Sequence, residues 1–540
     1  MKCPQSASER LNPIYVNREQ TGDDARVRLV VDRIRNTLQG EVHRHVLTDE
    51  VAGIMIQSSE RFDLTTPAIK REETMAGSRH SGRLGRSVRR ITRRKVLKAG
   101  CLGHAGLTLP MLFLQRASAA TPIATPSIPQ VKSLILVFLE GGISHIDSLD
   151  IKPYAPSGFR GEFEPISTSI PGVQFCEHLP QLAARANQFA LVRSMAHRDE
   201  GHPSATHKLI TGSTLPNIPE DVGVDKHAGR DDAPCYAAAL DHLRPRGDGL
   251  PSGVHAPVYI RGAFNWPGQN AGFLGPRHDP LQINNKSDNF DYSQKHMSLD
   301  EAVGRGRFKN RRELLGQLDQ QRRQLDEHAA TSAFSEHQQG AFSVLNSPKL
   351  AQAFETDREP KAVGDRYGRH DYGQSLLLAR RLVQAGVRVV QANLRGWDTH
   401  YDGFKRLKQQ QFPKLDVSLS ALMDDLSDHG MLRDTLVIVT SEFGRTPQIN
   451  TPPAGQIPGR DHWAGCYSAL FAGGGVEVGQ VIGASNSIAS YPTTKSFSPS
   501  DLGATLYTAL GVDPATEIHD RVTGRPYPLN RGKVIRELYT

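Results

Sequence analysis

One stretch, residues 435–463, limits the possible folds more than any other part of the chain. It begins with the apolar, largely β-branched run Thr435–Thr440 (TLVIVT) and continues directly into Ser441–Pro447 (SEFGRTP). A short, continuous apolar run is typical of a strand that is buried on both faces. Open α/β sheets bind their ligands just past the carboxyl ends of such strands. The stretch therefore predicts an α/β fold with a site at this edge of the sheet.

The charged residues of this stretch suit an anion together with the metal ions that would hold it. They are two acids, two arginines and a histidine: Glu442, Arg445, Arg460, Asp461 and His462. Arginine forks bind phosphate or sulfate oxygens, and carboxylates and imidazoles bind divalent metals. The alternative is a structural network of ion pairs at the end of a strand.

Similar apolar runs recur along the chain and alternate with helical segments. The predicted strands are residues 133–140, 188–194, 387–393, 435–440 and 467–472, and the predicted helices are residues 373–385 and 404–432, with a further helix starting at residues 498–505. The alternation indicates an α/β fold, with a mostly parallel sheet that carries helices on both faces.

Two of these strands are followed by residues capable of chemistry. After residues 133–140 come paired glycines and then Ser144, His145 and Asp147, and a capped turn is the alternative reading. After residues 188–194, three histidines fall within eleven residues, and His202 or Ser204 is expected at the start of a helix.

A third predicted strand, residues 387–393, leads to Asp398 and His400. Side chains two residues apart on an extended strand project to the same face. On the loop that follows, both side chains are still able to turn toward one ion.

The formal net charge of +8 does not indicate a nucleic-acid partner, because it is concentrated in one segment. Residues 75–119 hold ten basic residues and no acidic residue, and the rest of the chain is close to neutral. The overall basicity is therefore no argument for a polyanion partner.

The basic segment has the features of an export signal. Thr92–Lys98 (TRRKVLK) matches the twin-arginine pattern, residues 99–114 form a moderately apolar run, and Ala117–Ala119 offers a cleavage site. The apolar run is too short and too interrupted to span a bilayer stably. We therefore expect a periplasmic or secreted protein whose partner during export is the twin-arginine translocase.

The signal divides the chain. Residues 1–74 are an over-extended reading frame or a disordered extension, 75–119 the signal peptide, 120–131 a linker and 132–540 the main domain. Charged, Gln-rich residues 300–355 predict a helical insertion on its surface. The main domain keeps only Cys176, Cys235 and Cys466, so disulfides do not provide its framework.

Five motifs occur in a fixed order from Lys132 to the end of the chain. They are Gly141–Asp147 (GGISHID), Gly396–His400 (GWDTH), Ser441–Pro447 (SEFGRTP), Gly459–Trp463 (GRDHW) and Gly473–Gly475 (GGG). This ordered set resembles the bacterial domain-of-unknown-function family 1501, which looks like a branch of the alkaline phosphatase and sulfatase superfamily.

The resemblance implies hydrolysis of phosphate or sulfate esters with one or two divalent metal ions, usually zinc or calcium. The candidate metal ligands are Asp147, Asp398, His400, Glu442, Asp461 and His462, with Glu140 as an alternative to Asp147. The candidate catalytic residues are Ser144, His202, Arg445 and Arg460.

The sequence departs from the superfamily pattern in two places. Phe443 stands where a second metal would have a histidine ligand, and the nucleophile stays open among Ser144, His202, Ser204 and Thr206. The Cys-x-Pro-x-Arg sequence of sulfatases is absent, so chemistry through a formylglycine is not expected.

Two functions follow from these observations. The first is an exported, metal-dependent hydrolase that acts on an anionic small-molecule or polysaccharide ester. The second is a non-catalytic binding protein on the same scaffold for an acidic surface polysaccharide, which Phe443 and the missing obvious nucleophile favour.

Overall fold

The computed structural model describes residues 128–214, 223–283 and 347–540. The predicted extension, the predicted twin-arginine signal and most of the predicted linker lie outside these residues. So does most of the predicted insertion at residues 300–355, of which the described part contains helix α10 (Pro348–Phe354).

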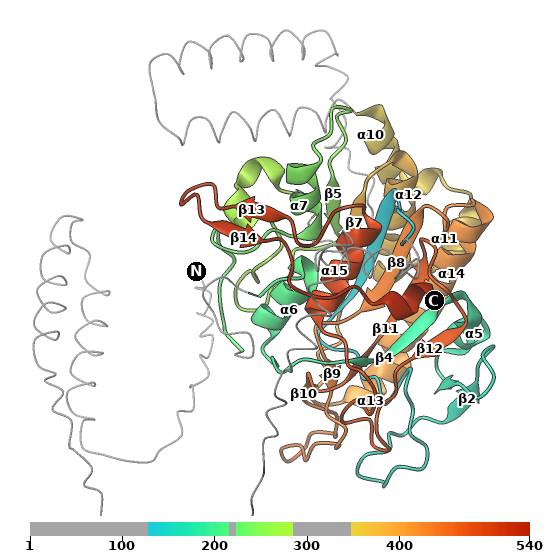
Figure 1. Ribbon diagram of the computed structural model, residues 1–540. Coiled ribbons are helices and arrows are strands. Elements are labelled where there is room, and N and C mark those ends of the chain that lie inside the picture. The colour runs from blue at the N-terminus through green and yellow to red at the C-terminus, as the bar shows by residue number, and fades with distance from the viewer. Residues whose placement is uncertain (1–127, 215–222, 284–346) are drawn as a thin grey trace, which may run out of the picture. The chain divides into compact units, whose positions relative to one another are not determined.

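An eight-stranded sheet forms the centre of the protein (Figure 1). Its strands lie in the order β12-β4-β11-β8-β1-β7-β5-β6. Their bounds are β1 (Ser133–Glu140), β4 (Ala190–Met195), β5 (Gly253–Ala256), β6 (Leu281–Gln282), β7 (Val389–Arg395), β8 (Thr435–Thr440), β11 (Tyr467–Gly473) and β12 (Gln480–Ile482). All five predicted strands are present, with small shifts at their ends.

The sheet is mostly parallel, as predicted. Strand β1 pairs in parallel with β7 and β8, and Leu136 lies opposite Gln391 and Ile438. Strands β5 and β7, β5 and β6, and β4 and β12 are also parallel pairs. The exception is β11, which runs antiparallel to both of its neighbours, β4 and β8.

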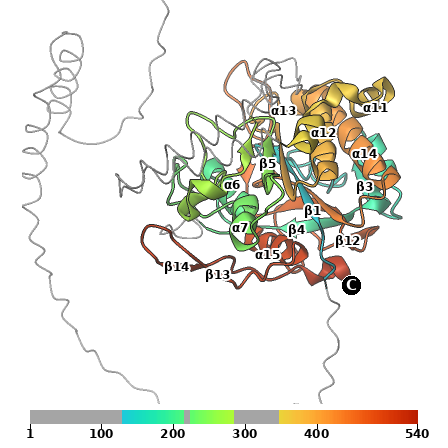
Figure 2. The same cartoon turned by 90° about the horizontal axis from the view of Figure 1, so that it is seen from above.

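Helices cover both faces of the sheet, which confirms the predicted fold class (Figure 2). One face packs on α5 (Pro180–Ala184), α10, α11 (Lys361–Tyr367), α12 (Asp371–Ala385) and α14 (Phe412–Asp428). The other packs on α6 (His202–Thr211), α7 (Tyr236–Leu243) and α15 (Pro499–Ala509). All eight residues of β1 are buried, and the six from Leu134 to Leu139 alternate between the two cores. This double burial explains why the middle of the strand is continuously apolar.

The helix predicted at residues 404–432 is divided into three parts. These are α13 (Gly403–Arg406), a π-helical turn (Leu407–Gln411) and α14. Pro413 stands in the first turn of α14, where its missing N–H would interrupt a continuous α-helix. Gln411 ends the π turn, and its side-chain amide Nε2 donates a hydrogen bond to the carbonyl of Gly396 at 2.7 Å. This bond supports the loop that carries Asp398.

The remaining elements of the described residues are short strands and 3-10 turns. The short strands are β2 (Pro165–Ser167), β3 (Gln174–Cys176), β9 (Gly444–Arg445), β10 (His462–Trp463), β13 (Glu517–His519) and β14 (Pro526–Pro528). The 3-10 turns are Ala186–Gln188, Gly272–Leu274, Pro276–His278, Thr356–Arg358 and Arg536–Tyr539. Among the described residues, no helix has the length and apolar character needed to cross a membrane.

Candidate metal centre

Four strands bring side chains to the same edge of the sheet. Strands β1, β7 and β8 are parallel, and β4 runs in the same direction because β11 is antiparallel to both β4 and β8. Their carboxyl ends therefore lie at one edge, where parallel sheets bind ligands. Strand β1 ends at Glu140, β7 leads to Asp398 and His400, β8 leads to Glu442, and the segment after β4 leads to His202 at the start of α6.

The fifth segment reaches the edge through a short antiparallel ladder. Strands β9 and β10 pair so that Arg445 lies opposite His462, and Gly444 lies opposite Trp463. Because β9 follows β8 by only a few residues, this ladder fixes His462 beside the exit of β8.

Three imidazoles converge on the carboxylate of Asp398. His400 Nε2 lies 3.1 Å and His462 Nε2 3.2 Å from Asp398 Oδ1, and His202 Nε2 lies 3.4 Å from Asp398 Oδ2. The Nε2 atoms of His400 and His462 are 3.0 Å apart. One ligand atom each from His202, Asp398 and His462 lie within 4.8 Å of one another, which is close enough to share one ion.

The outer nitrogen of each imidazole has a hydrogen-bond acceptor. His202 Nδ1 lies 2.7 Å from Glu442 Oε1, and His400 Nδ1 lies 2.7 Å from Asp461 Oδ1. His462 Nδ1 lies 3.0 Å from the backbone carbonyl of Glu200. An Nδ1–H that donates to such an acceptor leaves Nε2 as the nitrogen directed at Asp398, and Nε2 would bind an ion once its own proton is lost, as in metal-binding histidines.

Glu442 is held in place by the loop after β1. The backbone N–H of Gly141 donates to both of its carboxylate oxygens, at 3.0 and 3.1 Å, and the side chain is fully buried. The oxygens of Glu442 accept hydrogen bonds from Gly141 and contact Nδ1 of His202. The carboxylate therefore orients the imidazole of His202, while Asp398 contacts its Nε2.

The charges at this edge strongly perturb each other. Burial acts to raise the pKa of Asp398, but hydrogen bonds to the three histidines outweigh it and hold that pKa well below its usual range. Burial lowers the pKa of His202, yet Asp398 and Glu442 outweigh burial and raise it to about 9. The hydrogen bond to Asp398 raises the pKa of His400. The carboxylates therefore create a strongly negative potential, which favours a cation at this place.

Glu140, the last residue of β1, adds a further carboxyl group. It is 7% exposed, and burial raises its pKa to about 8. Arg395 Nε lies 3.6 Å from its Oε1, while its buried Oε2 has no hydrogen-bond partner. A buried oxygen without a partner is unusual, and a cation is one ligand that would satisfy it. Glu140 directly precedes Gly141, whose N–H donates to Glu442, and Glu442, His202 and Asp398 all act on the pKa of Glu140. Of Glu140 and Asp147, the two candidates for the first ligand position, Glu140 is therefore the one beside the cluster.

Asp147, the other alternative, belongs to a separate group of residues. Its two oxygens accept hydrogen bonds from Arg460 at 2.7 and 2.9 Å, and Ser144 Oγ donates to it at 2.5 Å. All three side chains are buried. The structure therefore does not bring Ser144, Asp147 and Arg460 to Asp398, because a buried ion pair joins them to each other.

The two arginines expected to hold an anion have their donors directed into the protein. Arg445, 1% exposed, donates to the carbonyls of Gly142 (3.1 Å), Trp397 (3.0 Å) and Arg460 (3.2 Å), to that of Gly141, and to Asp398 Oδ1 (2.7 Å). Besides its pair with Asp147, Arg460 donates to three backbone carbonyls. Neither guanidinium faces a substrate in this structure, because both brace loops of the site.

The serine candidates for a nucleophile are also engaged in structural contacts. Ser204 Oγ donates to Asp199 Oδ1 at 2.9 Å and accepts from the backbone N–H of Val224 at 3.0 Å. Thr206 lies in α6 with its hydroxyl buried and without a hydrogen-bond partner. Among the candidates, only His202 lies in the cluster around Asp398.

Several residues of the site were not predicted. Trp266 stacks on the ring of His202, with centroids 5.1 Å apart, and it lies in a loop-rich segment without any recognisable signal. Arg406 donates to the carbonyl of Asp398 at 3.3 Å, and Asn450 Nδ2 donates to the carbonyl of His400 at 2.8 Å. Arg395, beside Glu140, carried a weak signal, because it lies between the predicted strand 387–393 and the Gly396–His400 motif.

Phe443 packs against the cluster at the position where a histidine was expected. Its ring centroid lies 4.9 Å from that of His202 and 4.6 Å from that of His462. The side chain is fully buried. It fills the space beside the two histidines with an apolar ring, which provides no ligand for a second ion.

These features define an α/β protein with a candidate metal centre of His202, His462 and Asp398, with His400 beside them, at the carboxyl edge of its sheet. The chain belongs to the family described as "Protein of unknown function (DUF1501)", whose model matches residues 131–539. The resemblance inferred from the five motifs is thereby confirmed. Comparison with curated proteins found no match.

Solved structures with a distant similarity include the following three proteins. The alkaline phosphatase from the Antarctic bacterium TAB5 has a TM-score of 0.32 and 12% identity, and the match covers 72% of this chain and 99% of that chain. The lipoteichoic acid synthase LtaP from Listeria monocytogenes has a TM-score of 0.31 and 11% identity, with 75% of this chain and 76% of that chain covered. The PsFucS1 sulfatase from Pseudoalteromonas sp. has a TM-score of 0.32 and 13% identity, with 72% of this chain and 68% of that chain covered. Similarities of this size carry no conclusion about the function of the chain.

Proposed function

We propose that this protein is a metal-dependent hydrolase of phosphate or sulfate esters that acts after export. The observation that supports the proposal most directly is the convergence of the Nε2 atoms of His202, His400 and His462 on Asp398. Their outer nitrogens are all anchored, so the inward orientation does not depend on an ion being present.

The residues that would hold the ion are His202, His400, His462 and Asp398. Imidazole ligands favour zinc over calcium, because calcium prefers oxygen ligands. A single ion is proposed, since Phe443 occupies the space beside His202 and His462. Glu442 and Asp461, predicted from the sequence as ligands, are assigned to orient His202 and His400 instead.

A divalent ion at this place supplies polarisation of an ester oxygen and a lower pKa for a reacting water. The protein's own residues position the ester and its surroundings. Arg395 and Arg406 flank the cluster and are the cations proposed to orient the anionic group. Trp266 and Phe443 form the apolar wall behind His202, which reduces the access of water from that side.

The proposed substrate is an anionic ester, either a small molecule or part of a polysaccharide. The cluster by itself suits any metal-assisted hydrolysis. The choice of phosphate or sulfate esters rests on the ordered motifs, which resemble those of alkaline phosphatases and sulfatases.

Metal analysis of the purified protein, combined with assays on nitrophenyl phosphate and nitrophenyl sulfate, tests this proposal. We expect about one equivalent of a divalent metal per chain. His462→Ala should lose both the metal and the turnover, while His429→Ala, on the half-exposed histidine after α14, should keep both. A wild-type protein that binds no divalent metal would refute the proposal.

The alternative function, a binding protein for an acidic polysaccharide, is favoured by the engaged hydroxyl groups. Ser144 and Ser204 are buried and donate to Asp147 and Asp199, outside the group formed by His202, Asp398 and His462, so neither hydroxyl is placed beside the proposed ion. This alternative predicts a metal-free protein that binds sulfated or carboxylated polysaccharide and hydrolyses neither ester. The same assays therefore separate the two functions.

Export through the twin-arginine route is a separate part of the proposal. Replacing Arg93 and Arg94 by lysine should retain the protein in the cytoplasm, because the translocase recognises the arginine pair. The matched control replaces Arg89 and Arg90, which precede the motif, and should leave export unchanged. Fractionation of cells that express both variants measures the result.

A further inference from the structure

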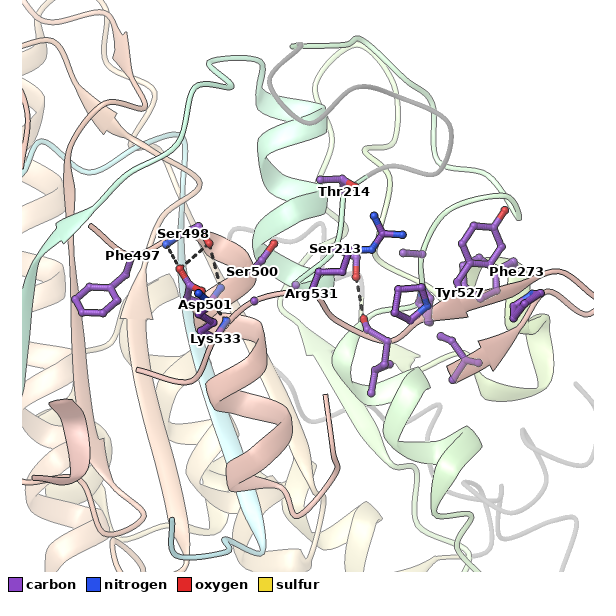
Figure 3. A pocket seen from close by; sticks show the side chains of 18 of the residues that line it. Ser213, Thr214, Phe273, Phe497, Ser498, Ser500, Asp501, Tyr527, Arg531 and Lys533 are labelled. Carbon is purple, nitrogen blue, oxygen red and sulfur yellow. Dashed lines mark hydrogen bonds between the residues drawn. The ribbon is translucent and has the colours of Figure 1, made fainter. Parts of the chain in front are cut away.

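A second pocket lies away from the candidate metal centre, where distant parts of the chain meet (Figure 3). Most of its lining comes from residues 212–214 after α6, residues 495–501 at the start of α15 and the C-terminal stretch 525–533 around β14, and Ala233, Pro234, Phe273 and Ile518 complete it. Its volume is about 720 Å³, which lies in the range of pockets that hold small organic molecules.

The charged side chains of this pocket are mainly positive. Lys495, Arg525, Arg531 and Lys533 line it, together with one carboxylate, Asp501. Lys495 forms an ion pair with Glu537. Among the described residues, no carboxylate forms an ion pair with Arg531 or Lys533, which therefore provide an uncompensated positive charge.

The carboxylate of Asp501 is already used by the protein. Its Oδ2 accepts hydrogen bonds from the backbone N–H and the hydroxyl of Ser498, in the capping box of α15. Its Oδ1 accepts from the backbone N–H of Lys533 at 2.7 Å. Asp501 thus fixes the wall of the pocket and is not available to bind a cationic ligand.

The opposite wall of the pocket is largely aromatic and apolar, with the guanidinium of Arg525 5.0 Å from the centroid of the Tyr527 ring. Figure 3 shows Lys533 and Asp501 at one side, Tyr527 and Phe273 at the other, and Arg531 between them. The rings of Tyr527 and Phe273 stack with their centroids 5.0 Å apart. Ile518 also lines the pocket, so one part of a ligand would meet cations and another part would meet apolar surface.

The pocket and the candidate metal centre lie at opposite ends of one helix. His202 begins α6, and Gly212, which lines the pocket, follows its last residue. Ten helical residues span roughly 15 Å, so the two places are distinct. None of the residues assigned to the metal centre lines the pocket.

We propose that this pocket is a second binding site, for an organic anion that carries a phosphate, sulfate or carboxylate group on an apolar or ring-shaped body. Arg531 and Lys533 bind the anionic group, and Phe273, Tyr527 and Ile518 contact the body. An inorganic anion alone would fill only a small part of the volume and would leave the apolar wall unused.

Calorimetric titration of the full chain with benzenesulfonate tests the proposal, with methyl phenyl sulfone as a neutral ligand of similar shape. We expect saturable binding of benzenesulfonate only. The double variant Arg531→Gln with Lys533→Gln should weaken it about tenfold, because two charge-assisted contacts are lost. Tyr527→Ser should weaken the binding of benzenesulfonate severalfold, because it removes a ring that contacts the apolar body of the ligand.

Two control variants separate this site from nonspecific attraction and from the metal centre. Arg433→Gln removes an exposed cation outside the pocket, and His462→Ala changes the metal centre. Both should bind benzenesulfonate as the wild type does. The proposal would be overturned if benzenesulfonate showed no saturable binding, or if Arg433→Gln weakened the binding as much as the double variant does. It would also be overturned if His462→Ala lost the binding while the double variant kept it. These results do not depend on whether the protein hydrolyses esters.

Discussion

At the scale of single residues, the candidate metal centre depends on which atom of each side chain faces inward. His202, His400 and His462 all present Nε2 to Asp398, because their Nδ1 atoms are held by Glu442, Asp461 and a backbone carbonyl. The residues that orient the imidazoles are therefore as important for the geometry as the imidazoles themselves.

This arrangement predicts different effects for the two kinds of carboxylate. Asp398→Asn should abolish metal binding, because it removes the charge on which the three imidazoles converge. Glu442→Gln and Asp461→Asn should weaken metal affinity by about 10- to 100-fold, as expected for residues that orient a ligand. Competition with a chelator of known affinity measures both. If Glu442→Gln and Asp398→Asn had the same effect, Glu442 would be a direct ligand.

The pair of Asp147 and Arg460 is predicted to stabilise the protein without acting on the metal. Both side chains are buried, so Arg460→Met leaves an unpaired carboxylate in the interior and should cost about 3–5 kcal/mol of unfolding free energy. Arg369→Met, which breaks the exposed pair with Asp365, should cost less than about 1 kcal/mol. Urea unfolding measures both free energies. A large loss of bound metal in folded Arg460→Met would contradict the structural role.

At the scale of elements, the strand ends hold the site together through close backbone contacts. The loop after β1 passes directly against the loop after β7, and Gly141 permits this contact. Its φ angle is +117°, and a Cβ at this position would collide with the backbone nitrogen of Asp398. Glycine is required here both by the backbone conformation and by the space.

Gly141→Ala is therefore predicted to disturb the metal centre through the backbone. The added Cβ must push the Asp398 loop away from β1, which should lower both the unfolding free energy and the metal affinity. Gly172→Ala is the matched control, because Gly172 also has a positive φ, +78°, but has open space around it. The control should cost about 1–2 kcal/mol from backbone strain and leave metal affinity unchanged. Equal metal affinity of the two variants would argue against the contact.

At the scale of the whole molecule, the sheet separates two hydrophobic cores, and several histidines are buried within the protein. Burial lowers the pKa of His207 to about 3 and that of His255 to about 3. Both are neutral in the folded protein. In the unfolded chain their pKa returns to the ordinary value of 6.5, so the unfolded chain binds protons that the folded protein does not.

Stability is therefore predicted to fall in acid. Because the unfolded state binds more protons, the contribution of each histidine is complete above pH 6.5 and decreases as the pH falls from 6.5 toward about 3. Each adds a slope of up to about 1.4 kcal/mol per pH unit. His255→Asn, which keeps an acceptor for Gln282, should flatten the slope, and the exposed control His519→Asn should not. Urea unfolding between pH 4 and 8 measures the slopes, and identical slopes would contradict the prediction.

Several features of the protein follow from the sequence by itself. Strands β1 and β8 were predicted from their continuous apolar runs, which the burial of both faces requires. The family was recognised from the order of five motifs. That Asp398, His400 and His462 lie at the sheet edge also followed, because each comes just after a strand or beside the loop of one.

The tertiary structure decided the partners of each charged side chain. Nothing local distinguishes Arg445 and Arg460, which brace loops, from arginines that hold a substrate, because the carbonyls and carboxylates that they contact come from distant segments. The same holds for Asp147, which pairs with a residue more than three hundred positions away. Hydrogen bonds between distant segments depend on how strands are ordered and how loops cross, and the local sequence does not carry that information.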